Sequence, residues 1–285
     1  MTKSEVLSKV DRKTLKYCLW SAGTALTAAG FLAFLVAPGR TPKEKRAPFI
    51  GRNYAHRGLH RIDRSIPENS LPAFEAAARI GYGVELDVHI TRDGELIVFH
   101  DDNTKRLCGV DSRVEDMTWS ELCKLRLAGT EYGIPLLSEA LEVLGTHCPV
   151  IIELKRGPRD REMCRKTYAL MKRYGGRYCV ESFDPGIVFW FRRHAPEILR
   201  GQLAYDPAEM VKDTSRLNAF LVGNLLTNFI TRPHFISYGL GRKPLLVRFC
   251  ERMGAMKVAW VSRDWASEKK NDAVIFEYYR PRVKY

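Results

Sequence analysis

The chain has 285 residues, of which 46 are Lys or Arg and 33 are Asp or Glu, so its formal net charge at pH 7 is +13. The basic residues are dispersed and no nucleic-acid-binding motif accompanies them, so we expect no nucleic-acid partner. The seven cysteines lack the close pairing of zinc motifs, and the chain contains no internal repeat. Beyond the first forty or so residues, the remaining length suits one barrel of roughly 250 residues and excludes a second large domain.

The amino-terminal region predicts a membrane anchor. Residues 1–17 form a basic segment, and residues 18–37 are mostly apolar without any charged side chain, which is about the ~20 residues that cross a bilayer as a helix. A cleaved signal peptide is the alternative. However, the apolar stretch is long for one, and no small-x-small cleavage site precedes Pro38. We therefore expect a single-pass membrane protein.

Residues 38–50 form a basic linker between this anchor and a domain over residues 51–285. The linker either attracts anionic lipid head groups or serves as a solvated spacer, and its cations are Arg40, Lys43, Lys45 and Arg46. Lys and Arg are equally frequent on the two sides of the apolar stretch, so the positive-inside rule gives no orientation. We favour the extracytoplasmic side for the domain, with membrane lipids as partners.

Two strand-like segments flank an Asp-Gly turn. Residues 84–90 and 95–99 are rich in β-branched and aromatic side chains with period-two patterning, which predicts two strands of a hairpin. A two-residue turn at residues 93–94 would place Asp87 directly opposite His100, on the same face of the sheet.

Two carboxylates and an imidazole are expected to converge in this hairpin. Glu85 lies two residues before Asp87, so both side chains point the same way, toward His100. The interleaved apolar residues indicate burial on both faces, against the alternative of a solvated acidic face. Burying unpaired carboxylates is costly, so a bound cation, a basic side chain or a shifted pKa should compensate. Oxygen ligands suit hard divalent cations such as Ca²⁺ or Mg²⁺.

Other apolar runs also end in charged or catalytic residue types. Residues 53–55 lead into His56, Arg57 and Gly58, and residues 150–152 lead into Glu153. Taken singly, such a residue is more often a surface charge or a structural histidine. Repeated along the chain, the pattern is typical of the catalytic end of a parallel barrel.

Together these segments resemble one family, the glycerophosphodiester phosphodiesterases. The matching stretches occur in the family's order between about residues 53 and 184: His56-Arg57-Gly58, Pro67-Glu68-Asn69-Ser70, Glu85-Leu86-Asp87-Val88, Thr91-Arg92-Asp93-Gly94, His100-Asp101, Ile134-Pro135-Leu136-Leu137, Ile152-Glu153-Leu154-Lys155 and Ser182-Phe183-Asp184. Beyond these the match thins, although residues 258–261 and 272–277 resemble the family's last two strands. Ser262-Arg263 stands where family members commonly carry Asn.

The resemblance implies an α/β fold, a TIM-type (β/α)8 barrel with a small insertion that caps the site. Residue patterns agree by predicting eight strands at residues 53–56, 84–88, 150–154, 178–182, 201–205, 235–238, 257–261 and 273–276. Helical patterns lie at residues 71–80, 138–144, 161–174 and 245–253. The arm that carries His100 pairs antiparallel and so lies outside the barrel. Residues 103–132 form the insertion, with a helix at 118–127.

The resemblance also implies metal-dependent hydrolysis of glycerophosphodiesters to glycerol phosphate and an alcohol. Three carboxylates would hold one divalent cation, Ca²⁺ or Mg²⁺, with Mn²⁺ as an option: Glu85, Asp87 and Glu153. Two cations would bind the substrate phosphate: Arg57 and Lys155.

Two histidines would supply acid–base catalysis. His56 and His100 would act as general base and general acid, in an order that the residues leave open, because the unperturbed imidazole pKa of ~6.5 lies near working pH. The attacker would be water or the glycerol 2-hydroxyl. Glu68 would support the metal and Trp260 would pack against the substrate.

Two alternative functions remain open. The first keeps the chemistry but moves it to the bilayer, where lysophospholipids would be cleaved as by a lysophospholipase D. The second is a membrane-tethered barrel that binds lipid or protein and catalyses nothing. The presence of every residue that the chemistry needs argues against this second alternative.

Overall fold

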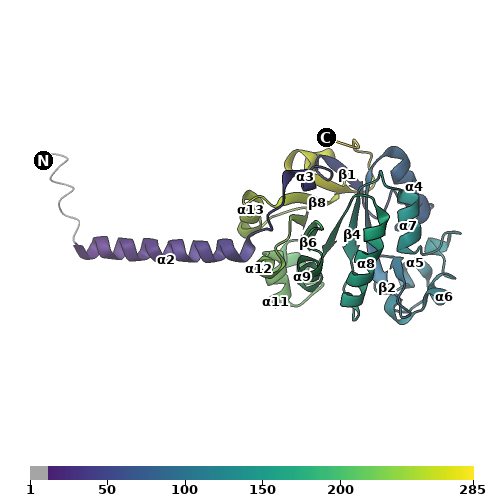
Figure 1. Cartoon of the computed structure of the whole chain (residues 1–285), viewed down its shortest axis with the longest axis horizontal. Coiled ribbons are helices and arrows are strands. Elements are labelled where there is room, and N and C mark those ends of the chain that lie inside the picture. Colours follow the sequence, from purple (N-terminus) through teal and green to yellow (C-terminus); the bar gives the residue numbers. More distant parts are fainter. Residues whose placement is uncertain (1–11) are drawn as a thin grey trace.

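The computed structural model of the chain describes residues 12–285. Within this range, eight parallel strands close into a barrel because β1 pairs with both β9 and β2, as expected for a TIM-type fold (Figure 1). The barrel strands are β1 (Arg52–Ala55), β2 (Gly83–Ile90), β4 (Val150–Leu154), β5 (Tyr178–Ser182), β6 (Arg200–Ala204), β7 (Phe235–Gly239), β8 (Met256–Ser262) and β9 (Ala273–Phe276). All eight predicted strands are confirmed, with shifts of two residues or fewer at their ends.

Helices surround the barrel, and the four predicted ones are confirmed: α4 (Leu71–Ile80), α7 (Leu137–Leu144), α8 (Asp160–Tyr174) and α13 (Leu245–Arg252). The bounds of helix α4 were predictable because residues at both of its ends favour helix termini. Its first turn is capped by Ser70, whose Oγ accepts from the Ala73 N–H, and it ends at Gly81 with φ of 94°. Residue patterns did not predict α9 (Pro185–His194), α10 (Pro207–Met210), α11 (Arg216–Gly223) or α12 (Asn228–Thr231).

The predicted helix over residues 118–127 is wrong. Only one turn forms, α6 (Trp119–Leu122), which starts with a capping box between Thr118 and Glu121. The backbone is extended at Arg126, with φ of −121° and ψ of 135°, so a helix cannot continue to residue 127, and a 3₁₀ turn, η3 (Leu127–Gly129), follows instead. This insertion, which also includes α5 (Lys105–Cys108), buries its own small apolar cluster against the hairpin arm.

The hairpin itself forms, but the predicted register is off by one residue. Strand β3 (Leu96–Val98) pairs antiparallel with β2, and Ile90 faces Leu96, so Asp87 is opposite Phe99 rather than His100. The turn contains three residues between Thr91 and Glu95, because Gly94 adopts a φ of 91° and donates its N–H to the Thr91 carbonyl. The extra residue shifts every pair along the hairpin by one position.

Period-two patterning decides which side chains enter the barrel. In β2, the apolar residues Val84, Leu86 and Val88 pack outward into the core cluster shared with α4, α7 and α8. Glu85 and Asp87 alternate with them and therefore point inward. Near the opposite end of the barrel, apolar side chains fill the interior, among them Tyr54, Ile151, Cys179, Phe235 and Val258. The acids thus lie in the barrel interior next to a layer of apolar side chains that fills its opposite end.

The amino-terminal helix α2 (Arg12–Val36) extends away from the barrel (Figure 1). Its carboxyl-terminal end packs on α12 and α13. Asn228 Nδ2 donates to the Val36 carbonyl at 3.1 Å, and Arg232 donates to the Phe34 carbonyl at 2.8 Å. Among the helices of the described residues, none is long and apolar enough to cross a bilayer. The anchor over residues 18–37 therefore stays a prediction.

The linker after α2 contacts the barrel. Its single helical turn, α3 (Lys43–Arg46), places Lys45 within 3.3 Å of the Glu197 carbonyl and Arg46 within 3.0 Å of the Gly254 carbonyl. Gly39 donates its N–H to Pro233. Two of the four cations expected to face lipid thus donate to the backbone of the barrel.

Candidate functional site

Three carboxylates converge inside the barrel, two from the middle of β2 and one from the carboxyl-terminal part of β4. Glu85, Asp87 and Glu153 are 2%, 1% and 8% exposed, and each offers an oxygen within 4.8 Å of those of the other two. The strand register explains this, because Asp87 pairs with Glu153 across the two parallel strands. The predicted acidic cluster is therefore present.

Two basic side chains neutralise part of this charge. Lys155 Nζ lies 2.7 Å from Asp87 Oδ1 and 2.6 Å from Glu153 Oε1. Arg57 Nε lies 3.5 Å from Asp87 Oδ2, and the Arg57 backbone N–H donates to Glu85 Oε2 at 3.0 Å. The positive φ of Arg57, 52°, turns its peptide toward the acids.

The protonation equilibria of the three acids differ because their neighbours differ. Burial and the charges of Asp87 and Glu153 raise the pKa of Glu85 well above its usual value. Burial acts in the same direction on Asp87, but Lys155, His100 and Arg57 together hold the pKa of Asp87 well below the usual range. The cluster contains more buried acid than its two basic neighbours neutralise. A bound divalent cation would relieve this repulsion, and the all-oxygen donor set fits a hard cation.

Asn69 completes the surroundings of Asp87. Its Nδ2 donates to Asp87 Oδ2 at 2.8 Å, and its Oδ1 accepts from the Asp87 N–H at 3.5 Å. The residue is 1% exposed with a left-handed φ of 54°, so the backbone before α4 is bent to bring the amide to the acid. Asn69 thus orients the Asp87 carboxylate through Oδ2, whereas Lys155 contacts Oδ1.

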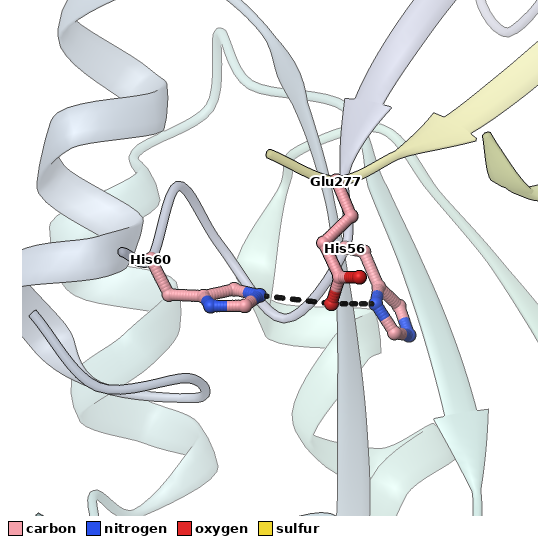
Figure 2. A group of neighbouring side chains, drawn as sticks. All are labelled: His56, His60 and Glu277. Carbon is pink, nitrogen blue, oxygen red and sulfur yellow. Dashed lines mark hydrogen bonds and ion pairs between the residues drawn. The ribbon is translucent and has the colours of Figure 1, made fainter. Parts of the chain in front are cut away.

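His56 follows β1 and is held between two acids. Its Nε2 lies 4.0 Å from Glu85 Oε2, and its Nδ1 lies 3.2 Å from Glu277 Oε1. Glu277 follows β9, the strand that closes the barrel next to β1. Figure 2 shows Glu277 between two imidazoles, with His60 Nε2 on its other side at 3.3 Å. A carboxylate can only accept, so His56 Nδ1 carries the proton and Nε2 is left with a lone pair.

His100 is held in the same manner at the end of the hairpin arm. Its Nδ1 lies 2.7 Å from Asp101 Oδ1, so Nε2 is again the free nitrogen. His100 lines the same cavity as Glu153 and Lys155. The two imidazoles thus approach the acids from different segments: His56 follows β1 and lies beside Glu85, and His100 lies after β3 and lines one cavity with Glu153.

A chain of ion pairs connects the two sides of the site. Arg57 Nη1 donates to Glu68 Oε1 at 2.7 Å, and Arg106 donates to both oxygens of Glu68 at 2.7 and 2.9 Å. Arg106 also donates to both oxygens of Asp101 at 2.5 and 3.0 Å. Because Asp101 binds His100, the insertion that carries Arg106 positions this histidine. Glu68 contacts Arg57 and Arg106, so the expected metal-supporting role of Glu68 is indirect.

A cavity of about 730 Å³ opens beside His100, Glu153 and Lys155. It runs toward α10 and α11, and its far wall is formed by Phe183, Tyr205, Met210, Asn218 and Val222. Trp260 is one layer behind this wall. Its ring lies edge-to-face against Phe183 and Tyr205, and its Nε1 donates to the Ser237 carbonyl at 3.1 Å. The expected packing of Trp260 on a substrate would therefore act through these two rings.

The structure brings eight of the nine predicted site residues into one continuous network: His56, Arg57, Glu68, Glu85, Asp87, His100, Glu153 and Lys155. Several of its partners had been given no role from the sequence: His60, Asn69, Asp101, Arg106 and Glu277. Glu277 had a usable signal, because it directly follows a predicted barrel strand, and Glu153 is the penultimate residue of another. Arg106 had none: the family resemblance placed the insertion over the site, but nothing in the order of residues distinguishes Arg106 within it.

The comparisons with known proteins agree with this geometry. A sequence profile of the glycerophosphoryl diester phosphodiesterase family matches residues 56–277. A glycerophosphodiester phosphodiesterase of Caldanaerobacter subterraneus is 38% identical over 225 residues, covering 72% of this chain and 83% of that protein. Lysophospholipase D GDPD1 of Rattus norvegicus is 33% identical over 174 residues, covering 56% of this chain and 53% of its own, so the chain matches about half of that relative's length.

Solved structures show the same fold. A phosphodiesterase from Oleispira antarctica, in complex with the product sn-glycerol-3-phosphate, superposes with a TM-score of 0.65 at 22% identity, covering 80% of this chain and 93% of that one. A glycerophosphodiester phosphodiesterase from Parabacteroides distasonis gives a TM-score of 0.61 at 25% identity, with the same coverage. Both likenesses support the barrel architecture described above.

Proposed function

Because this chain belongs to the glycerophosphoryl diester phosphodiesterase family, we propose that it hydrolyses glycerophosphodiesters to glycerol phosphate and an alcohol. One observation carries the proposal. Two imidazoles with free Nε2 atoms approach a buried cluster of three acids and two bases within the matched residues. This is the set of groups needed to neutralise a phosphodiester and to move two protons.

In the proposed site, Glu85, Asp87 and Glu153 hold one divalent cation. The bound cation would supply charge stabilisation for the phosphate oxygens. Ca²⁺ and Mg²⁺ are the ions that this donor set suits, with Mn²⁺ as a further option. Arg57 and Lys155 bind the anionic phosphate, and Lys155 can turn toward it from the two acids that it contacts.

Proton transfer is assigned to the two histidines. One Nε2 accepts the proton of the attacking hydroxyl, from water or from the glycerol 2-hydroxyl, and the other donates to the departing alkoxide. Burial lowers the pKa of His56 to about 4, against the opposing effect of the hydrogen bond that His56 donates to Glu277. In this environment His56 is neutral at pH 7, which suits the general base. His100 is then the general acid.

Replacement of each histidine tests the proposal. We expect His56→Ala and His100→Ala each to reduce kcat by roughly 10² to 10⁴, while circular dichroism and Ca²⁺ affinity remain those of the unmodified chain. The matched control is His147→Ala, an exposed residue in the turn before the amino-terminal end of β4, away from the strand end that carries Glu153. Near-normal turnover by both variants would exclude the acid–base roles. Turnover in excess chelator would exclude the metal.

A second candidate function is lysophospholipase D activity on monoacyl phospholipids. Two observations favour it: the amphipathic cavity beside His100 and the resemblance to the rat lysophospholipase D. The proposed anchor at residues 18–37 would hold the barrel at a membrane, with the extracytoplasmic side as our preferred location. Choline release from glycerophosphocholine and from lysophosphatidylcholine, compared at equal enzyme concentration, separates the two functions. Release from the deacylated substrate alone would exclude the lipid activity.

A further inference from the structure

Exposed apolar side chains gather on three helices of the barrel. Leu217 and Phe220 on α11 are 68% and 56% exposed, and Leu245 on α13 is 77% exposed. The exposed apolar side chains on α11, α12 and α13 form what we call the apolar face: Leu217, Phe220, Phe229, Ile230, Leu245 and Phe249. Elsewhere on the described barrel helices such residues occur singly, as Ile80 on α4, Val143 on α7 and Phe189 on α9 do. A grouped apolar surface of this kind marks an interaction site.

The apolar face continues onto the end of α2. The Phe34 and Phe229 rings lie 6.3 Å apart between centroids, and the Arg232 guanidinium lies over the Phe34 ring. Phe31 and Leu32 on α2 are also exposed. Figure 1 shows α2 leaving the barrel on the side where α11, α12 and α13 lie. Exposed apolar surface therefore runs from the helix onto the barrel.

Basic residues outnumber acidic residues on and next to these helices. The segment over residues 207–252, which contains all three helices, has seven Lys or Arg and three Asp or Glu. Five of these cations are exposed: Lys212, Arg216, Arg242, Arg248 and Arg252. An apolar face with a positive border complements the surface of an anionic bilayer, where apolar side chains enter the interface and cations meet the head groups.

Helix α11 connects the apolar face to the cavity. Asn218 and Val222, one turn apart, line the cavity beside the catalytic residues. Leu217 and Phe220 lie on the other side of the same two-turn helix and are exposed. One wall of the cavity is therefore also part of the apolar face.

From these contacts we propose that the apolar face docks on an anionic phospholipid bilayer, so that α11 borders the path of a monoacyl lipid from the membrane into the cavity. The inference rests on the proposed phosphodiesterase function for its second part only. Docking itself can be measured without turnover. Leu217 and Phe220 would thereby have a membrane-binding role that no catalytic step requires.

Depth-dependent fluorescence quenching tests the docking. The full chain is prepared with Phe220→Trp or, as a matched control, with Val143→Trp on α7. Each variant is bound to vesicles of phosphatidylcholine and phosphatidylserine with brominated acyl chains. We expect Phe220→Trp to add an emission component that is blue-shifted and quenched, relative to the unmodified chain with its native tryptophans. Val143→Trp should add an unquenched component. Equal quenching of the two added tryptophans would overturn docking by this face.

A double variant tests the lipid path and separates it from the proposed function. Leu217→Ser with Phe220→Ser should raise the apparent KM for lysophosphatidylcholine in anionic vesicles by roughly tenfold and leave hydrolysis of soluble glycerophosphocholine unchanged. Ile80→Ser with Val143→Ser is the control. An unchanged KM in the double variant would overturn the path.

Two further outcomes have distinct meanings. If the unmodified chain hydrolyses neither substrate, the proposed function fails, while the quenching result still decides the docking. If the chain dimerises in sedimentation, the double variant does not, and bromine quenching is absent, the face binds a second copy of the chain and bilayer docking is overturned.

Discussion

His56 Nδ1 lies 3.2 Å from Glu277 Oε1, and the two residues follow the strands that close the barrel, β1 and β9. Burial raises the pKa of Glu277, but its contacts with the His56 and His60 imidazoles hold that pKa well below the usual range. Glu277 is therefore anionic and accepts a hydrogen bond from the His56 Nδ1–H. The histidine Nε2 beside Glu85 is thereby available to take a proton from the attacking hydroxyl.

Replacing Glu277 should impair catalysis more than substrate binding. In Glu277→Gln the amide can donate to Nδ1, which favours the wrong imidazole tautomer, so we expect kcat to fall by roughly 100-fold with KM nearly unchanged. Steady-state kinetics measure both constants. Glu277→Asp should recover part of the loss, and Glu131→Gln on the exposed insertion should have no effect. Unchanged kcat in Glu277→Gln would show that Glu277 does not orient His56.

Lys155 competes with the proposed cation for the same acids. Its ammonium contacts both Asp87 and Glu153, so Lys155→Met leaves Arg57, which contacts Asp87, as the remaining basic neighbour of this pair. We expect the affinity for Ca²⁺ to rise by roughly tenfold, while the KM for glycerophosphocholine rises because a phosphate contact is lost. Isothermal titration and steady-state kinetics measure the two effects, with Lys124→Met on the insertion as control. Weaker cation binding in a folded Lys155→Met variant would contradict the shared site.

Arg106 joins Glu68 to Asp101 and so transmits the position of the insertion to His100. Arg106→Ala removes four hydrogen bonds and should lower kcat by roughly tenfold through a misplaced imidazole. Arg106→Lys should recover only part of the activity, because an ammonium cannot reproduce two bidentate contacts. Equal kcat in Arg106→Ala and the unmodified chain, with equal melting temperatures, would rule out this positioning role.

His234 should make the barrel sensitive to acid. Burial, together with the charges of Arg200, Lys45 and Arg46, lowers the pKa of His234 to about 3, and the imidazole Nδ1 accepts from the Arg200 N–H. The unfolded chain therefore binds this proton more readily, with a pKa of ~6.5. The contribution of His234 to stability is complete above pH ~6.5 and is lost as the pH falls toward about 3.

The dependence of stability on the protonation of His234 can be measured by denaturant unfolding at several pH values. Between pH 6 and pH 4, the free energy of unfolding should decrease less steeply with falling pH in His234→Asn than in the unmodified chain. We expect the two slopes to differ by about 1.4 kcal/mol per pH unit. His147→Gln, at an exposed position, is the control. An unchanged slope in His234→Asn would show that His234 is not the linked group.

Several elements were readable from residue order because local rules specify them. The strands β4, β5 and β9 have the predicted bounds, since each is a short apolar run between polar loops. Helix α4 likewise has the predicted bounds, from Ser70 at its start and Gly81 at its end. The hairpin turn shows the limit of such rules. A two-residue and a three-residue turn both suit Asp93-Gly94, and the structure contains the latter.

The residue types of the site and their places at strand ends were evident in the chain alone, because period-two alternation and sharp polar termini are properties of neighbouring residues. The contacts that orient those residues depended on the folded barrel. Glu277 and His56 are separated by 221 positions, and they meet only because β9 and β1 pair to close the sheet. Arg106 reaches Glu68 and Asp101 because its insertion folds back over the barrel. Pairing between distant segments reflects the packing of the whole chain, and no local pattern encodes it.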